Sequence, residues 1–336
     1  MKRTLALLMA LLMMGVATGC STTTEETPAA DDGQETQATQ NEESGGDYQL
    51  CVILKTLATE YWSYIAAGAE QAGEDLGLDV NVIGASSETS YDEQLNMIET
   101  EISSGVYDGF VIAPLQADTV ATAIENIDVP VVAVDTNFDS PKVLSFVGTG
   151  NESAGEVGGK AAAEACKEAG LPMTAICIMG VQGDSTTESR LEGYRKGFES
   201  AGGEVLEVQY CDSAPDKAAT IMESVMQNYP DGVGAVLVSG DDYAIAAARI
   251  AQSNPNFENT IFVGFDGIQS ACEAIMDGRE TMSVAQDPFG MGYQSVEAVV
   301  QAIEGEELPE FIDTGASIVD QSNAEERLEL LKSYTE

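Results

Sequence analysis

Residues 48–84 read YQLCVILKTLATEYWSYIAAGAEQAGEDLGLDVNVIG. The first apolar run predicts a buried strand over Gln49–Leu54, the amphipathic stretch a helix over Tyr61–Leu76, and the second apolar run a strand over Asp79–Ile83. Strands that are apolar on both faces are typical of parallel sheets covered by helices on each side. This stretch therefore predicts an α/β fold built on a parallel sheet.

The same alternation continues through the rest of the chain. We expect further strands at 109–113, 130–134, 174–179, 204–209, 235–239 and 260–265. We expect further helices at 91–104, 119–125, 153–169, 187–201, 216–228, 242–252 and 269–276. Two such runs in succession predict two doubly wound parallel-sheet lobes, and 336 residues is a length typical of two domains.

Polar and aromatic side chains follow many of the predicted strands. Ligands of doubly wound folds bind beyond the carboxyl ends of the strands and between domains. The stretch 55–62 (KTLATEYW) follows the first strand and the stretch 135–137 (DTN) the fourth. In the second half the corresponding stretches are 184–190, 212–213, 240–242, 266 and 286–287. We therefore expect a ligand cleft between the lobes.

Charge and composition exclude several function classes. The chain has 57 acidic and 14 basic residues, a formal net charge of -43, and no histidine. Nucleic-acid binding needs clustered Lys and Arg, so that class is excluded. The absence of histidine removes the usual general base and the commonest metal ligand, which disfavours an enzyme and a metal site. The acidic surface is interpreted as a solvated face, with steering of cationic ligands as the alternative.

The N-terminus has the pattern of an export signal. A basic start (Met1-Lys2-Arg3), a short apolar run and the small residues before Cys20 predict a signal peptide over 1–19. The sequence Ala17-Thr18-Gly19-Cys20 resembles a bacterial lipobox, which implies lipidation of Cys20. The alternative is a plain signal peptide followed by an incidental cysteine.

Residues 20–47 predict a disordered acidic tether. The stretch 21–47 contains eight acidic residues and neither Lys, Arg nor an aromatic residue, so it cannot bury enough apolar surface to fold. As a flexible coil it would span about 30 Å. The expected location is the extracellular face of a bacterial membrane, or the periplasm where an outer membrane exists, with the membrane touched through the lipid alone.

The cysteines of the body show no close spacing. The body has five cysteines, an odd number, and most of them lie in or beside apolar runs. They are Cys51, Cys166, Cys177, Cys211 and Cys272. Buried free thiols are the first interpretation, with disulfide pairing as the alternative, because exported cysteines often pair.

Several motifs resemble the ribose-type periplasmic sugar-binding proteins of bacterial ABC importers. They are Lys55–Trp62, Val131–Asp135, Val147–Gly155, 190–194 (RLEGY) and 263–267 (VGFDG), and the likeness covers about 48–320. It implies two Rossmann-like lobes joined by a three-strand hinge near 147–150, 286–288 and 315–318. The first lobe would comprise 48–149 with 287–314, and the second 150–286 with 315–336. It also implies a monomer without cofactor that captures a small sugar or related polar solute for an ABC transporter permease.

The resemblance, together with the loops after the strands, gives the candidate ligand-binding residues. From the first lobe these are Lys55, Thr59, Tyr61, Trp62, Asp135, Thr136 and Asn137. From the second lobe and hinge they are Glu188, Arg190, Ser213, Gly240, Asp266 and Gln286. Tyr61 and Trp62 offer flat faces to a sugar ring, and Asp135 and Asp266 accept hydrogen bonds from hydroxyls. The alternatives are a core aromatic for Trp62 and turn or capping roles for the two aspartates.

Three positions depart from the ribose binders. Glu188 stands where they carry Arg, Gly240 where they carry Asn, and Ser213 where they carry Phe. Arg190, two residues beyond Glu188, could turn inward instead. These departures leave another pentose, a hexose, a polyol or a compound bearing an amine as alternatives to ribose.

Three other functions were weighed. Gly148-Thr149-Gly150 resembles the start of a dinucleotide fingerprint, but Ser153 replaces the third glycine and the match follows the wrong strand for an NAD enzyme. A transcription repressor needs a basic helix-turn-helix where this chain has an export signal and an acidic tether. A sensor that presents the solute to a membrane receptor remains the alternative to import.

Overall fold

The computed structural model describes residues 48–334. The predicted signal peptide, the lipidation site Cys20 and the acidic tether lie outside these residues. No helix in the described part is both long enough and apolar enough to cross a membrane.

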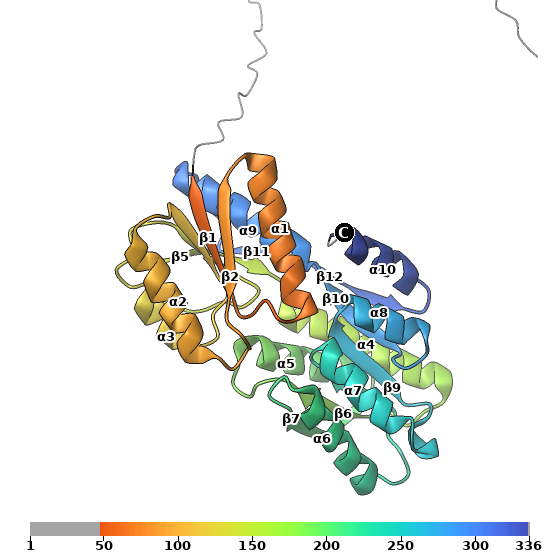
Figure 1. Cartoon of the computed structure of the whole chain (residues 1–336). Coiled ribbons are helices and arrows are strands. Elements are labelled where there is room, and N and C mark those ends of the chain that lie inside the picture. Colours follow the sequence, from red (N-terminus) through yellow and green to blue (C-terminus); the bar gives the residue numbers. More distant parts are fainter. Residues whose placement is uncertain (1–47, 335–336) are drawn as a thin grey trace, which may run out of the picture. The chain divides into compact units, whose positions relative to one another are not determined.

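The first sheet has six parallel strands in the order β11-β5-β4-β3-β1-β2 (Figure 1). Its strands are β1 (Gln49–Leu54), β2 (Asp79–Gly84), β3 (Gly109–Ile112), β4 (Val131–Val134), β5 (Val143–Gly148) and β11 (Phe311–Asp313). Its helices are α1 (Glu60–Leu76), α2 (Tyr91–Ser104), α3 (Ala117–Ala123) and α9 (Pro288–Ile303). Alternate residues of β1 face opposite sides: Leu50 and Val52 pack with α1 and α9, whereas Cys51 and Ile53 pack with α2 and α3.

The second sheet also has six strands, in the order β12-β10-β9-β8-β6-β7. They are β6 (Thr174–Met179), β7 (Glu204–Tyr210), β8 (Ala235–Val238), β9 (Ile261–Asp266), β10 (Met282–Gln286) and β12 (Ala316–Asp320), and only β12 is antiparallel to its neighbour. Its helices are α4 (Asn151–Ala169), α5 (Ser185–Ser200), α6 (Pro215–Asn228), α7 (Asp241–Ala251), α8 (Gln269–Met276) and α10 (Ala324–Ser333), and a 3-10 turn covers Pro255–Phe257. The prediction of two doubly wound parallel sheets is therefore confirmed.

The chain passes between the two sheets at three places in the described residues. These are Thr149-Gly150 after β5, Asp287 after β10, and Thr314-Gly315 after β11. The first and third passes are hydrogen-bonded, since Thr314 N donates to Gly148 O at 2.9 Å and Thr149 Oγ1 to Gly315 O at 3.3 Å. The first and third connections thus lie side by side, near the expected hinge segments.

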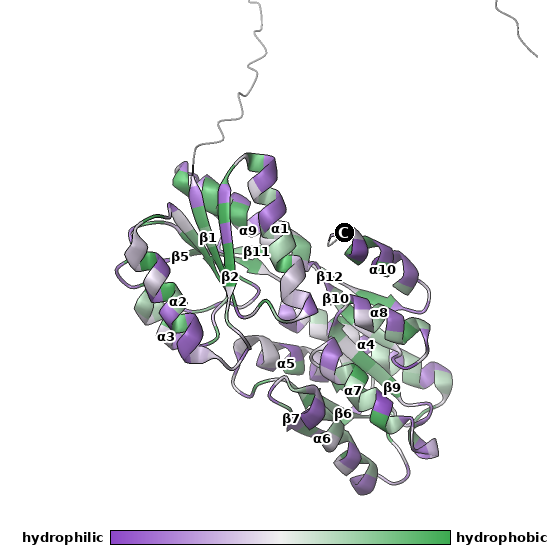
Figure 2. Ribbon diagram, in the orientation of Figure 1, coloured by the Kyte–Doolittle hydropathy of each residue, from purple (hydrophilic) through white to green (hydrophobic). Residues whose placement is uncertain are grey.

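The strands carry the apolar residues and the outer helix faces carry the polar ones (Figure 2). The five cysteines of the body are buried and free, which confirms the first interpretation of them. Burial raises the pKa of the Cys177 thiol to about 12, so this thiol stays protonated at neutral pH.

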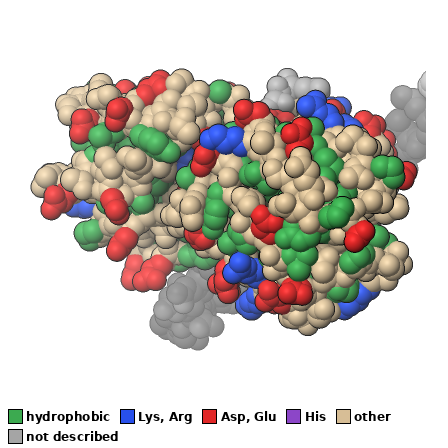
Figure 3. Space-filling model, turned by 90° about the horizontal axis from the view of Figure 1, so that it is seen from below, with side chains coloured by type: hydrophobic (Ala, Val, Ile, Leu, Met, Phe, Trp, Pro, Cys, Tyr) green, Lys and Arg blue, Asp and Glu red, His purple; other side chains and the backbone are tan. Residues whose placement is uncertain are grey.

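Acidic side chains are spread over the face shown in Figure 3, with isolated basic side chains among them. This distribution is that of a solvated acidic surface.

Candidate functional site

Loops at the carboxyl ends of the two sheets meet. Lys55, just after β1 of the first sheet, lies 3.7 Å from Asp184, just after β6 of the second, measured between Nζ and Oδ2. Glu60 at the start of α1 accepts a hydrogen bond from the backbone N–H of Gln269 at the start of α8. The loops after β1 and β6 and the first turns of α1 and α8 therefore face one region.

Arg190 is the central cation of this region. Its Nε donates to Asn151 Oδ1 at 2.9 Å, and its Nη1 donates to Ser239 O at 2.8 Å and to Asp266 Oδ1 at 3.2 Å. Its guanidinium carbon lies 3.8 Å from the centroid of the Phe265 ring. The side chain is 7% exposed, so the guanidinium is fixed in one direction by four groups.

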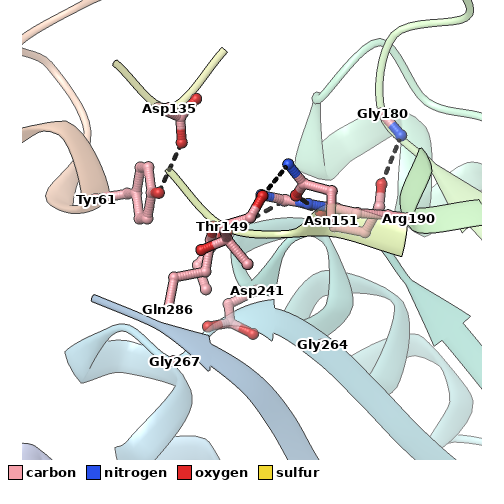
Figure 4. Close-up of polar contacts among 12 residues, drawn as sticks. Tyr61, Asp135, Thr149, Asn151, Gly180, Arg190, Asp241, Gly264, Gly267 and Gln286 are labelled. Carbon is pink, nitrogen blue, oxygen red and sulfur yellow. Dashed lines mark hydrogen bonds and ion pairs between the residues drawn. The ribbon is translucent and has the colours of Figure 1, made fainter. Parts of the chain in front are cut away.

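Asp135 is held on the opposite side by Tyr61 (Figure 4). The Tyr61 hydroxyl donates to Asp135 Oδ1 at 2.7 Å, and the Thr136 hydroxyl donates to Oδ2 at 2.8 Å. Burial and the nearby aspartates raise the pKa of Tyr61 well above its ordinary value, so its hydroxyl remains a donor at neutral pH. Asp135 is thus a carboxylate that is fixed in orientation and 5% exposed.

Asp266 connects Arg190 with the hinge. The side-chain amide of Gln286, the last residue of β10, donates to Asp266 Oδ1 at 2.7 Å. Burial raises the pKa of Asp266, and the adjacent Arg190 charge opposes that rise. Asp266 therefore joins the inward-facing arginine to the second pass between the sheets.

Strained backbone gathers in the same loops. The non-glycine residues with positive φ in the described part are Asp135 (60°), Asp212 (50°), Ser213 (54°) and Asp266 (113°). Asp135 directly follows β4 and Asp266 ends β9, whereas Asp212 and Ser213 lie in the loop after β7. Such strain persists where the surrounding structure fixes it and is common at ligand sites.

Lys55 lies between the two sheets and beside Trp62. Its Nζ is 5.8 Å from the Trp62 ring centroid, and the indole N–H of Trp62 donates to Glu88 Oε1 at 2.7 Å. Burial disfavours the charged ammonium, but Asp184 and further carboxylates outweigh it and raise the pKa of Lys55. Trp62 is 3% exposed and packs edge-on against Tyr61, so most of its ring belongs to the core.

Ser213 and Gly240 lie around Tyr243. A methyl group at Gly180 would lie 2.9 Å from Ser213 Oγ and 3.3 Å from the Tyr243 hydroxyl, so these groups converge on the end of β6. A methyl group at Gly240 would overlap the Tyr243 ring. Glycine at this position therefore leaves room for the tyrosine.

Three predicted residues are not joined to this network. Glu188 accepts hydrogen bonds from Gly183 N at 2.9 Å and from the Tyr210 hydroxyl at 3.1 Å. Asn137 is exposed and accepts from the N–H of Phe138. Thr59 precedes α1 without capping it through its side chain.

The candidate list omits several residues that make these contacts, among them Glu60, Glu88, Asn151, Asp184, Ser239 and Tyr243. Each lies in a loop or first helical turn that follows a strand, and Glu88 follows β2, whose loop contributes none of the candidate residues. A systematic search of every such loop and first helical turn would have found them.

Two open hollows on the outer helices contain none of the predicted residues. One lies over α2 and α3 beside Glu99 and Asp118, and the other over α6 and α7 beside Glu223 and Arg249. We place the candidate site at the converging loops because donors and acceptors from both sheets meet there. In the described residues no group of three or more Asp, Glu, Cys or His side chains could hold a metal ion.

The chain matches the family model described as "Periplasmic binding protein domain" over residues 50–307. It is 28% identical over 272 residues to the ribose import binding protein of Bacillus subtilis (strain 168), covering 79% of this chain and 85% of that protein. It is 26% identical over 266 residues to the D-allose-binding periplasmic protein of Escherichia coli (strain K12), covering 76% and 84%.

A solved structure has a similar fold. It is a carbohydrate transporter solute binding protein from Agrobacterium radiobacter in complex with D-arabinose. The TM-score is 0.76 at 25% sequence identity, covering 85% of this chain and 98% of that chain.

Proposed function

Because the chain belongs to the periplasmic binding protein family, we propose that it is an extracellular lipoprotein that captures a small sugar or related polar solute and delivers it to an ABC transporter permease. The relatives support this proposal, since their names state ribose import, D-allose binding and a D-arabinose complex. They are binding proteins, and we extend that role to this chain.

The observation that carries the proposal is the pairing of oriented donors and acceptors from the two sheets. Asp135 comes from the first sheet, and Arg190 with Asp266 comes from the second. A sugar hydroxyl both donates and accepts, so it matches carboxylates on one side and a guanidinium on the other. Buried groups of this kind are also selective, because a ligand without hydroxyls would leave them unpaired.

We further propose that two bodies close on the solute. The first comprises residues 48–149 with 287–314 and the second 150–286 with 315–336, and the three passes between the sheets are the hinge. A solute that contacts both bodies stabilises the closed arrangement, because it binds that arrangement more tightly than the open one. The proposal includes a monomer that the lipid on Cys20 holds at the extracellular side of the membrane.

The first experiment is a ligand screen on the purified chain. D-ribose, D-allose, D-arabinose, glycerol, glucosamine and NAD are each added while thermal unfolding is followed. A bound sugar at a hundred times its Kd stabilises the fold by about 2.7 kcal/mol, which raises the Tm clearly. A response to NAD with none to any sugar or polyol would overturn the proposal.

The second experiment measures closure by small-angle scattering with and without the sugar that gives the largest shift. We expect a smaller radius of gyration with the sugar present. Lys55→Met, which removes the contact between the loops after β1 and β6, should weaken sugar binding, whereas Lys160→Met on the outer face of α4 should not. Identical scattering at saturating sugar would contradict closure.

A further inference from the structure

Two buried carboxyl groups lie together beneath the candidate site. Asp241 at the start of α7 is 0% exposed, and Glu280 just before β10 is 4% exposed. A methyl group added at Gly264 of β9 would overlap both Asp241 Oδ1 and Glu280 Oε1, so the two oxygens lie against the same backbone atom. Figure 4 shows Asp241 near Gly264 of β9 and near Gly267, which follows that strand.

The two carboxyl groups have different partners. Asp241 accepts from the Ser283 hydroxyl at 2.6 Å and from the Ile268 N–H at 3.0 Å, which suits an ionised carboxylate. Neither oxygen of Glu280 accepts a hydrogen bond of normal geometry among the described residues, although the nearby Gly264 backbone N–H lowers the pKa of Glu280 and partly offsets its burial. A buried carboxylate without partners is unfavourable, whereas a protonated Glu280 can donate to the neighbouring Asp241.

The surroundings provide little positive charge to hold two anions. The titratable or charged groups that face the pair are Tyr194 of α5, Asp242 of α7, Asp266 of β9, Cys272 of α8 and Arg279 before β10. Of the nearby cations, Arg279 is partly exposed and pairs with Asp277 at 3.2 Å, and Arg327 of α10 donates to the carbonyl oxygens of Gly267 and Gln286. Burial raises the pKa of Asp241 to about 7 and that of Glu280 well above its ordinary value.

The pair also holds the turn that carries Asp266. The Gly267 N–H donates to Ser283 Oγ at 3.1 Å, and Ser283 in turn donates to Asp241. Asp241 therefore holds the N–H of Ile268 directly and that of Gly267 through Ser283, while Arg327 Nε holds the Gly267 carbonyl oxygen at 3.1 Å. These two residues follow Asp266, whose own φ is 113°. A change in Asp241 would move the carboxylate that contacts Arg190.

We propose that Asp241 and Glu280 share a single proton at neutral pH, and that the pair positions the turn that presents Asp266 to the solute. The second half of this statement rests on the proposed function. Asp241 and Glu280 are positioning residues, since they act through Asp266.

Proton retention is tested by unfolding the full chain in urea from pH 5.5 to 8, in wild type and in Glu280→Gln. Ordinary carboxyl groups, with pKa values of about 4, have lost their protons in the unfolded chain across this range. The native state keeps one, so its stability falls as pH rises until the pair ionises. The unfolding constant of wild type should therefore rise about tenfold per pH unit relative to Glu280→Gln.

The chain has no histidine, and comparing wild type with Glu280→Gln cancels the contributions of other buried groups whose pKa burial raises, such as Asp266 and Cys177. Glu297→Gln is the matched control, since burial raises the pKa of Glu297 on α9 far from the pair. It should keep the steep dependence of wild type. Equal slopes of unfolding free energy against pH in wild type and Glu280→Gln would overturn the shared proton. A wild-type slope that changes when sodium is replaced by tetramethylammonium would also overturn it, because that change would indicate a bound metal ion.

Positioning is tested by the affinity for D-ribose, D-allose and D-arabinose from pH 7 to 9.5. Wild type should lose affinity as the pair loses its last proton, by at most tenfold per pH unit. Glu280→Gln, whose amide donates to Asp241 at every pH, should bind as wild type does at pH 7 and keep that affinity. If wild type and Glu280→Gln lose sugar affinity in parallel as pH rises, the pair does not position Asp266.

Amide NMR separates this inference from the proposed function. In wild type the Gly267 and Ile268 N–H signals should titrate as the pair loses its last proton, and in Glu280→Gln they should not. If no sugar binds wild type, the proposed function fails and these two signals still decide the inference. Signals that stay unchanged with pH in wild type would overturn it.

Discussion

At the scale of single residues, the site depends on a few side chains that each serve several partners. Arg190 contacts Asn151, Ser239, Asp266 and the Phe265 ring. Burying a guanidinium costs free energy, and the contacts with these partners offset that cost. The same partners fix the direction of the guanidinium, and that direction makes it available to a solute.

Arg190→Met should therefore destabilise the protein strongly and remove sugar binding. Asp266 would lose its cation while remaining 18% exposed at its side chain, at a cost of about 3–5 kcal/mol. Urea unfolding measures this cost. Lys196→Met, which breaks an exposed pair with Glu156, should cost about 0–1 kcal/mol and leave binding intact. Equal effects of the two variants would contradict the role of Arg190.

The Tyr61 hydroxyl orients Asp135 before a solute arrives. Tyr61→Phe should lower the free energy of unfolding by about 1 kcal/mol, the typical net value of one hydrogen bond. It should also weaken sugar binding, as titration calorimetry would record. Tyr229→Phe removes a similar hydroxyl-to-carboxylate contact, with Glu207 at 3.1 Å, away from the site. If both variants bind sugar like wild type, Asp135 needs no support from Tyr61.

At the scale of elements, glycines let helices approach closely behind the site. A methyl group at Gly193 of α5 would overlap the backbone oxygen of Glu152 in α4, and one at Gly155 would lie 2.6 Å from Arg190 O. Because α5 carries Arg190, the packing of α4 against α5 sets how far the guanidinium reaches toward Asp266.

Gly193→Ala should accordingly separate α4 from α5. Overpacking of this kind costs about 1–3 kcal/mol and should weaken sugar binding through displacement of Arg190. Thermal unfolding and a sugar titration measure the two effects. Glu164→Ala, on the exposed face of α4, should change stability by about 0.5 kcal/mol or less. A stable Gly193→Ala with normal binding would show that the helices can move apart freely.

At the scale of the whole molecule, acidic charge exceeds basic charge by a wide margin. The formal net charge is -43. Self-repulsion of this size opposes the compact state, and dissolved salt screens it. With 57 acidic residues and 14 Lys and Arg residues, most carboxylates cannot each have a basic partner of their own.

Salt should therefore stabilise the protein. Raising NaCl from about 0.01 M to 1 M shortens the screening length from about 30 Å to about 3 Å, and the Tm should rise across that range. Tetramethylammonium chloride at equal ionic strength should act similarly, because screening does not depend on which cation is present. A Tm that stays constant or falls with both salts would contradict net repulsion.

The sequence by itself determined the layered architecture. Apolar runs such as Gln49–Leu54 and Thr174–Met179 lie in the structure at the predicted residues, because a strand buried on both faces must be apolar throughout. Helix α2 also matches its predicted range, 91–104. The loops after the strands followed from topology, so Asp135, Asp266 and Gln286 could be singled out without coordinates.

Several elements were not predicted from the sequence pattern. Ser145 interrupts the apolar run of β5, although the residue is buried in the sheet. Strands β11 and β12 are short and largely exposed, so they lack an apolar run. Helix α9 returns to the first sheet from far along the chain, and its packing against α1 is a long-range contact that no local pattern encodes.

Only the tertiary structure decided which side chains meet. Adjacent residues on one helix turn point in different directions, so the loop sequence left both Glu188 and Arg190 as candidates. Glu188 contacts Tyr210, whereas Arg190 reaches Asp266, because α5 packs with that face toward β9. The partnership of Asp241 with Glu280 arises in the same way: the two residues are distant in sequence, and β9 brings both against Gly264.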